Sequence, residues 1–208
     1  YYSSWSGTYD DKVDSNLQIN TIGYGLKLNN TTGGDSYDNV IIGSHLGLLS
    51  GTNGGTIGYK NVCIGSSIAA GKASFGAYNV FIGNENASAG THVGTYNICI
   101  GPSAGRTISN GSTSNIIMGW NAGRDIGSGK RNTLLGGNAG RYITSDSNND
   151  GGNNNICIGD ESGPNIGSGR IHDNNRIYID ASGNYKEENS LIYGDQSTSS
   201  AQTLSFNA

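Results

Sequence analysis

A five-residue unit recurs along this chain, and no other feature constrains the fold as strongly. The unit is an asparagine, two residues that are mostly apolar, an Ile, Leu or Met, and a glycine. Successive copies are 22, 18, 18, 18, 17 and 23 residues apart, and they begin at Asn39, Asn61, Asn79, Asn97, Asn115, Asn132 and Asn155. A nearly fixed period indicates a repeat architecture in which each unit buries its apolar side chains against its neighbours.

The residues of the unit favour a short strand followed by a corner. Apolar, mostly β-branched residues bounded by Asn and Gly are typical of strands. Glycine supplies the positive φ that a sharp corner needs, and asparagine tolerates that region better than most residues. A coil of about 18 residues has room for two short strands and two turns. Coils stacked about 4.8 Å apart pair in parallel. The sequence therefore predicts an all-β fold, a parallel β-solenoid (β-roll) of about 18-residue coils, with its asparagines stacked along one edge.

Each unit also has a second half. A small residue and a glycine follow the strand, at Ala70-Gly71, Ala89-Gly90, Ala104-Gly105, Ala122-Gly123, Ala139-Gly140 and Ser162-Gly163. A lone apolar residue comes next, at Ile57, Phe75, Val93, Ile108, Ile126, Ile143 and Ile166.

The strand is apolar on both faces. Side chains alternate across a strand, so the first and third apolar residues, such as Val80 and Ile82, face the same way. We expect these two to face the interior, and the middle residue to face out. The middle residues are nevertheless apolar, at Ile41, Cys63, Phe81, Cys99, Ile117, Leu134 and Cys157. A thin solenoid covers one face only, which favours a second layer made of copies of the same chain around an axis.

The ends of the chain differ from its middle. Residues 1–36 add aromatic residues and are expected to form a capping or connecting segment, and residues 37–170 the solenoid. Residues 171–208 lose the glycine corners and are expected to form a closing β segment. Its strands are predicted at 175–180, 191–195 and 203–206.

The repeat Asn-x-x-Ile-Gly-x-x-Ala-Gly resembles the head repeats of trimeric autotransporter adhesins and of phage tail fibres. The stretch from Asn175 to Asp195 resembles the segment that precedes the self-cleaving chaperone of such fibres. The resemblance covers roughly residues 37–208 and implies a homotrimer, intertwined or side by side. It also implies a virion or extracellular location and a host cell-surface glycan or receptor as partner. The expected function is a structural segment of a viral or phage tail fibre that presents a receptor-binding surface. The alternatives are a bacterial adhesin of the trimeric autotransporter type and a polysaccharide depolymerase.

Charge and composition narrow the partners. The net charge of −4 and the pI near 5.2 disfavour a nucleic-acid partner, because phosphate binding needs clustered Lys and Arg. The chain has no apolar run close to the roughly 20 residues of a membrane span, so membrane insertion is not expected.

One column of side chains is a candidate ligand site. Arg106, Arg124 and Arg141 follow the Ala-Gly corner of three consecutive coils, with Trp120 and Tyr142 nearby. Guanidinium groups next to aromatic rings suit acidic sugars or phosphates. The alternative is a solvated edge whose charges prevent lateral aggregation.

A second candidate is a calcium site. Asp146, Asn148 and Asp150 place oxygen ligands at alternate positions before Gly151, as in the first half of a calcium loop. The twelfth position would be Cys157, so the bidentate glutamate is missing. A polar insertion loop explains the same residues. We otherwise expect no cofactor.

The sequence predicts no catalytic residues. His45, His92 and His172 accompany no nucleophile motif. The adjacent Asp160 and Glu161 are the best candidates for the two carboxylates of a glycosidase, but an exposed corner would point them apart. The cysteines occupy one ladder position too far apart for disulfides, and are expected to be reduced core thiols.

Overall fold

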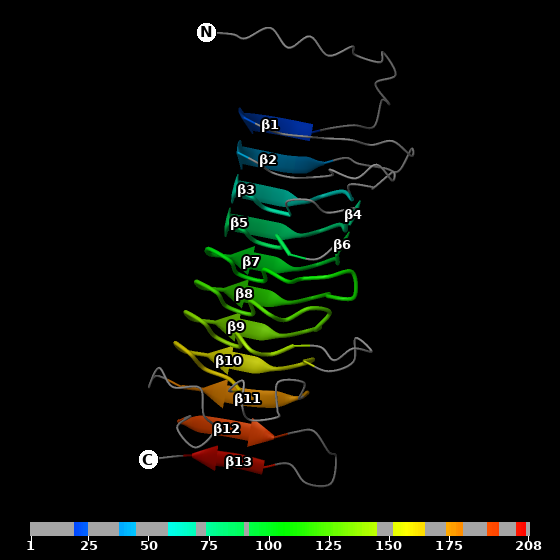
Figure 1. Cartoon of the computed structure of the whole chain (residues 1–208). Coiled ribbons are helices and arrows are strands. Elements are labelled where there is room, and N and C mark those ends of the chain that lie inside the picture. The colour runs from blue at the N-terminus through cyan, green and yellow to red at the C-terminus, as the bar shows by residue number, and fades with distance from the viewer. Residues whose placement is uncertain are drawn as a thin grey trace, which may run out of the picture.

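The computed structural model describes the chain in nine stretches and contains no helix within them. The described residues are 19–24, 38–44, 58–69, 74–89, 92–144, 152–164, 174–180, 191–195 and 203–206. In Figure 1 the strands lie one below another as the rungs of a single stack, with β1 at one end and β13 at the other.

Eleven strands form one sheet in the order β1-β2-β3-β5-β7-β8-β9-β10-β11-β12-β13, and β4 and β6 form a second, small sheet. The first part of the stack is β1 (Ile19–Tyr24), β2 (Asn39–Ser44), β3 (Val62–Ser66), β5 (Val80–Asn84), β7 (Ile98–Ile100) and β8 (Ile116–Met118). The rest is β9 (Thr133–Leu135), β10 (Ile156–Ile158), β11 (Arg176–Ile179), β12 (Ile192–Asp195) and β13 (Thr203–Phe206). The small sheet pairs β4 (Ser74–Phe75) with β6 (His92–Val93).

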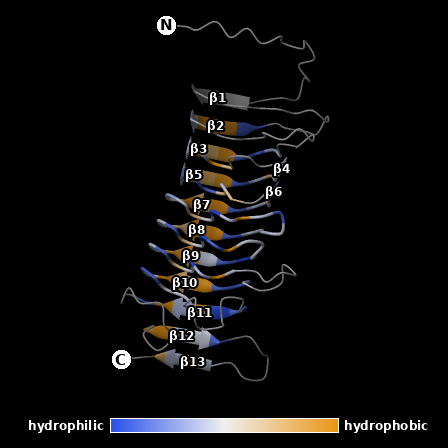
Figure 2. Ribbon diagram, in the orientation of Figure 1, coloured by the Kyte–Doolittle hydropathy of each residue, from blue (hydrophilic) through white to orange (hydrophobic). Residues whose placement is uncertain are grey.

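The strands from β1 to β11 pair in parallel, each with the equivalent strand of the next coil. The register sets motif on motif: Ile41 lies opposite Cys63, and Cys63 opposite Phe81. The predicted parallel β-solenoid is therefore confirmed. Figure 2 shows the result as a column of apolar strands with hydrophilic turns at its edges.

The prediction of which strand face is interior was wrong. The middle residues, from Ile41 to Cys157, are at most 1% exposed and form the core of the coils. The first and third residues face outward: Ile116 is 41% exposed and Met118 40%. The motif asparagine lies two residues before the middle residue and is buried, so both must point to the same side of the strand.

The second half of the coil completes the core. The predicted apolar residues within the described stretches are buried, namely Phe75, Val93, Ile108, Ile126 and Ile143. Ile57 and Ile166 lie outside those stretches. Two coils differ from the expected alignment, because Ala69 and Ala87 take the place that Gly105 holds in the next coil. Both alanines are buried and adopt a φ of 50°, against 60° for Gly105.

The motif asparagines form a continuous buried ladder, as predicted. The side-chain amide of Asn97 donates to Oδ1 of Asn79 at 3.2 Å and to the carbonyl of Ser112 at 3.1 Å. Its own Oδ1 accepts from the backbone and side-chain amides of Asn115, at 3.3 and 2.8 Å. Because each amide is satisfied by the neighbouring coils, the ladder stabilises the stack without leaving buried polar groups unpaired.

The motif glycines let the coils approach closely. Gly65 has a φ of 141°, and a Cβ at this position would overlap the carbonyl oxygen of Gly83 in the next coil. An L-residue with a side chain fits neither the dihedral angle nor the space.

The C-terminal end changes the pattern. Strand β11 still pairs in parallel with β10, but β12 and β13 pair antiparallel. Arg176 stands where the ladder would place an asparagine: its backbone amide donates to Oδ1 of Asn155 at 3.0 Å. Its guanidinium forms an ion pair with Asp195 of β12. The three strands expected in this region are confirmed. At the other end, β1 lies inside the expected capping segment and pairs Gly23 with Gly43.

Candidate binding surfaces

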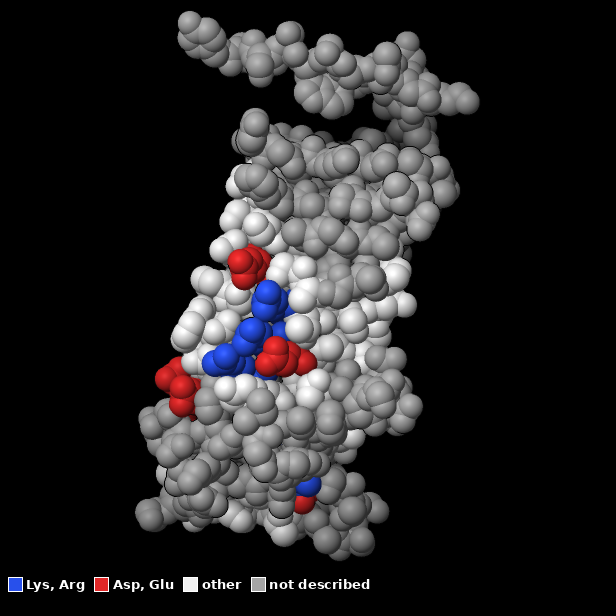
Figure 3. All heavy atoms as spheres, viewed as in Figure 1, with Lys and Arg blue, Asp and Glu red and all other residues white. Residues whose placement is uncertain are grey.

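The structure places the three arginines at equivalent points of successive coils. The carbonyl of Arg124 accepts from the backbone amide of Thr107 at 3.0 Å, and that of Arg141 from Asp125 at 3.2 Å. We call Arg106, Arg124 and Arg141 the arginine column. Figure 3 shows Lys and Arg side chains gathered in a short column on this face, flanked by Asp and Glu.

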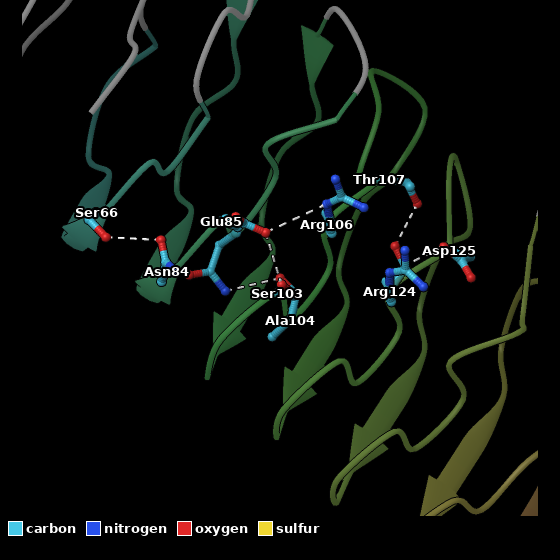
Figure 4. A network of polar contacts seen from close by, with 10 residues as sticks. Ser66, Asn84, Glu85, Ser103, Ala104, Arg106, Thr107, Arg124 and Asp125 are labelled. Carbon is cyan, nitrogen blue, oxygen red and sulfur yellow. Dashed lines mark hydrogen bonds and ion pairs between the residues drawn. The ribbon is translucent and has the colours of Figure 1, made fainter. Parts of the chain in front are cut away.

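Acidic residues balance part of the column. Nε of Arg106 lies 3.9 Å from Glu85, and Nε of Arg124 lies 4.0 Å from Asp125 (Figure 4). The four side chains of these pairs are 31–48% exposed, so each pair contributes little to stability. Arg141 has no acidic partner among the described residues.

The two aromatic residues predicted beside the column differ in their contacts. Tyr142 packs under the guanidinium of Arg141, with 5.1 Å from Cζ to the ring centroid. Arg141 also donates to Oδ1 of Asn138 at 3.5 Å. Trp120 lies on the preceding corner and is 58% exposed, and no described residue makes a ring contact or ion pair with it. The structure thus brings Arg141 and Tyr142 together and leaves Trp120 apart from them.

A second surface is the outward face of the parallel strands, which the sequence prediction had turned inward. It consists of the first and third apolar residues of each unit. From β2 to β10 these are Val, Ile, Met and Leu, with Thr133 the single polar member. We call it the apolar face. A contiguous, partly exposed apolar surface of this kind is a candidate interaction site.

The cysteines take no part in a surface site. Cys63, Cys99 and Cys157 are free and buried, as expected of core thiols. Burial raises the pKa of the Cys63 thiol to about 12 and also raises the pKa values of Cys99 and Cys157. A thiol that stays protonated at neutral pH is a poor nucleophile.

Among the residues that the structure describes, the remaining candidates gather into no site. Asp160 is exposed, and Glu161 follows it on a corner with a φ of 53°. His92 lies in β6, and His45 and His172 lie outside the described residues. The proposed calcium ligands Asp146, Asn148 and Asp150 also lie outside them. Within the described stretches no three His, Cys, Asp or Glu side chains come together as metal ligands, and no helix could cross a membrane.

Comparisons of the chain with family models, with curated proteins and with solved structures find no match.

Proposed function

We propose that this chain is a structural fibre segment that assembles as a homotrimer through its apolar face. The observation that carries the proposal is the division of each strand into two apolar faces. The middle residues fill the interior of the chain, while the first and third residues stay partly exposed, most of all Ile116 at 41% and Met118 at 40%. Covering this face removes apolar area from water, and each Å² buried stabilises the assembly by about 25 cal/mol.

A second and third copy of the same chain fit this face better than an unrelated partner. The face repeats every coil with one register, so an identical chain presents side chains at the same spacing. Its outward positions from β2 to β10 carry no charge that a partner would have to neutralise. Closed symmetry is also the rule for oligomers of one chain. Three chains around an axis agree with the resemblance to trimeric fibre and adhesin heads.

In this proposal the rest of the surface serves recognition, on a virion or outside the cell. The candidate contact for an acidic host glycan is the part of the arginine column formed by Arg124 and Arg141, together with the aromatic residues Trp120 and Tyr142. The guanidinium of Arg141 and the ring of Tyr142 beneath it support that choice. Three symmetry copies would add avidity to a weak single site. An adhesin on a bacterial surface would use the same physics.

The mass in solution tests the assembly. We expect the mass of three chains at micromolar concentration, and the monomer mass after Met118→Asp, because that change buries charge in the interface. Asn110→Asp places the same charge on an exposed turn and should leave the mass unchanged. A parent chain that is monomeric and stable would contradict the proposal. Phe81→Asp is no test of the interface, since Phe81 is fully buried within one chain and its replacement prevents folding.

Binding to host cells tests the recognition surface separately. Arg124→Ser together with Arg141→Ser should abolish binding while the melting temperature stays within a few degrees of the parent, because both side chains are partly exposed. Unchanged binding by the folded double variant would reduce the column to a solvated edge.

A further inference from the structure

A second column of side chains lies on another edge of the solenoid. It consists of the residue that precedes each motif asparagine, together with Asn175, which precedes Arg176 at the equivalent point of the next coil, and we call it the corner column. Its members share a left-handed backbone with φ between 56° and 59°, at Asp38, Lys60, Tyr78, Tyr96, Ser114, Arg131, Asn154 and Asn175. Because the backbone is the same in every coil, the side chains lie one above another at the coil spacing.

Aromatic rings occupy consecutive rungs of this column. The rings of Tyr78 and Tyr96 are stacked, with centroids 4.8 Å apart and planes 8° apart. At the near end of the stack, Tyr59 meets the Tyr78 ring edge-on at 5.2 Å and the Lys60 ammonium lies 5.4 Å from its centroid. That end is therefore closed by protein.

The other end of the stack is open. Tyr78, Tyr96 and Ser114 are each 18 residues apart and have the same φ of 59°, so a ring at position 114 would continue the stack. Serine is too short to do so. In agreement, Tyr96 is 56% exposed and Tyr78 only 36%. One face of the Tyr96 ring is thus presented to solvent above Ser114.

Hydroxyl groups lie beside this open face. Thr95, Thr113 and Lys130 follow one another as paired residues in three coils, next to Tyr96, Ser114 and Arg131. The hydroxyl of Thr113 is 3.4 Å from those of both Thr95 and Ser114. Hydroxyls at this spacing donate to and accept from the hydroxyls of a sugar.

Two cations lie one coil beyond Ser114. Nε of Arg131 donates to Oδ1 of Asn154 at 2.6 Å, which fixes the side chain. The described residues provide no acidic partner for Arg131 or for the adjacent Lys130. The arginine column, by contrast, has Glu85 and Asp125 beside it. Among the described residues, the positive charge at this end of the ring stack is therefore less neutralised than that of the arginine column.

From this arrangement we propose that the corner column binds an acidic sugar at the rung of Ser114. A pyranose ring stacks its C–H face on Tyr96, its hydroxyls bond to Thr113 and Ser114, and its carboxylate or sulfate pairs with Arg131. Tyr96 and Arg131 are two rungs apart, about 10 Å, which leaves one rung for the sugar ring. The open ring face alone would also attract a cation, but Arg131 and Lys130 repel one. The proposal deepens the proposed recognition function, on which it rests for its biological meaning, and assigns it a second, separate site.

The test measures the affinity of the full chain for oligosaccharides that contain uronic, sialic or sulfated residues, each beside an uncharged counterpart. We expect binding of at least one acidic member and at least tenfold weaker binding of its uncharged counterpart. Tyr96→Ala and Arg131→Gln should each weaken binding about tenfold, the loss expected from one ring contact or one charge-assisted pair. Ser114→Tyr should abolish it, because the new ring occupies the rung itself. The matched control is Ser67→Tyr, the same change on a left-handed corner of another column.

Each other result overturns the site. Absence of binding to every acidic member does so, as does undiminished binding by Ser114→Tyr. Loss of binding by Tyr96→Ala only together with loss of the oligomer mass would assign Tyr96 to a contact between copies. Loss through Arg124→Ser and Arg141→Ser, with Tyr96→Ala unaffected, would place recognition in the arginine column and leave the proposed function standing.

Discussion

The middle of the solenoid and its C-terminal end belong to one sheet, but their strands are held together differently. From β3 to β10 every coil places an asparagine in the buried ladder and a glycine at the following corner. At β11 Arg176 takes the place of the asparagine, Asp180 takes that of the glycine, and the next two strands run antiparallel. The backbone amide of Arg176 donates to Oδ1 of Asn155, the last asparagine of the ladder, and its guanidinium pairs with Asp195. The motif asparagine and the motif glycine thus accompany the parallel stacking of each coil. The parallel stack stops where both residues are replaced.

The largest effect is expected at a motif glycine. Gly65→Ala should cost more than about 4 kcal/mol of unfolding free energy, because the new methyl meets the backbone of the next coil at a positive φ. Gly194→Ala in β12 is the matched control: its Cβ would lie 3.3 Å from that of Ile177, and its φ is not positive. Denaturant melts of both variants give the difference. Equal losses would mean that the two regions pack alike.

Removing a rung of the ladder comes next. Asn97→Ala leaves Asn79, Asn115 and the carbonyl of Ser112 each short of a buried partner, so we expect a loss of about 3 kcal/mol. Asn110→Ala, on an exposed turn, should change stability by less than about 0.5 kcal/mol. A loss below 1 kcal/mol at Asn97 would show that the ladder is incidental to the stack.

The end of the ladder is expected to be less sensitive. Arg176→Asn removes a buried guanidinium and leaves Asp195, which is partly exposed, without its ion pair. We expect a loss of about 2 kcal/mol, of which Asp195→Asn in the same chain restores about half, because the second change removes the unpaired charge. A double-mutant cycle by thermal melting measures this. Additive losses would show that the ion pair does not hold β12.

The smallest effect is expected in the pH dependence of the unfolding free energy, and it comes from a buried thiol of the parallel stack. Burial raises the pKa of Cys63 from an ordinary 9.0 to about 12. Below about pH 8 the thiol is protonated in the folded and the unfolded chain, so it causes almost no pH dependence. Between about pH 8 and 12 the unfolded chain loses the proton first, and stability falls as the pH rises. From pH 8 to 9.5 this costs about 0.8 kcal/mol for one thiol.

Cys63→Ala provides the comparison for that measurement. Its unfolding free energy is lower at pH 8 because a buried group is lost, but it should fall less steeply than that of the parent as the pH rises above 8. Parallel curves for the two chains would show that Cys63 ionises in the folded state as easily as in the unfolded one.

Several features of the fold could be read from particular residues. The spacing of the asparagines predicted the coil, and the chemistry of Asn and Gly predicted the ladder and the corners. The prediction that Ala70-Gly71 and Ala89-Gly90 are the second corner of their coils was wrong. Ala69 and Ala87 adopt the left-handed angle of that corner without a glycine. The corner column was not predicted, although the sequence carries a signal for it. Tyr78, Tyr96 and Ser114 each directly precede a motif asparagine and are 18 residues apart.

The sequence by itself determined the period, the strand positions and the fact that both strand faces are apolar, because these depend on residues close together in the chain. The tertiary structure decided which face is interior. The alternation of side chains along a strand places Val80 and Ile82 on one face and Phe81 on the other. It does not say which of the two faces is interior. Closure of the coil breaks the symmetry: the asparagine amide must reach the neighbouring coils to satisfy its hydrogen bonds, and it takes the middle residue inside with it.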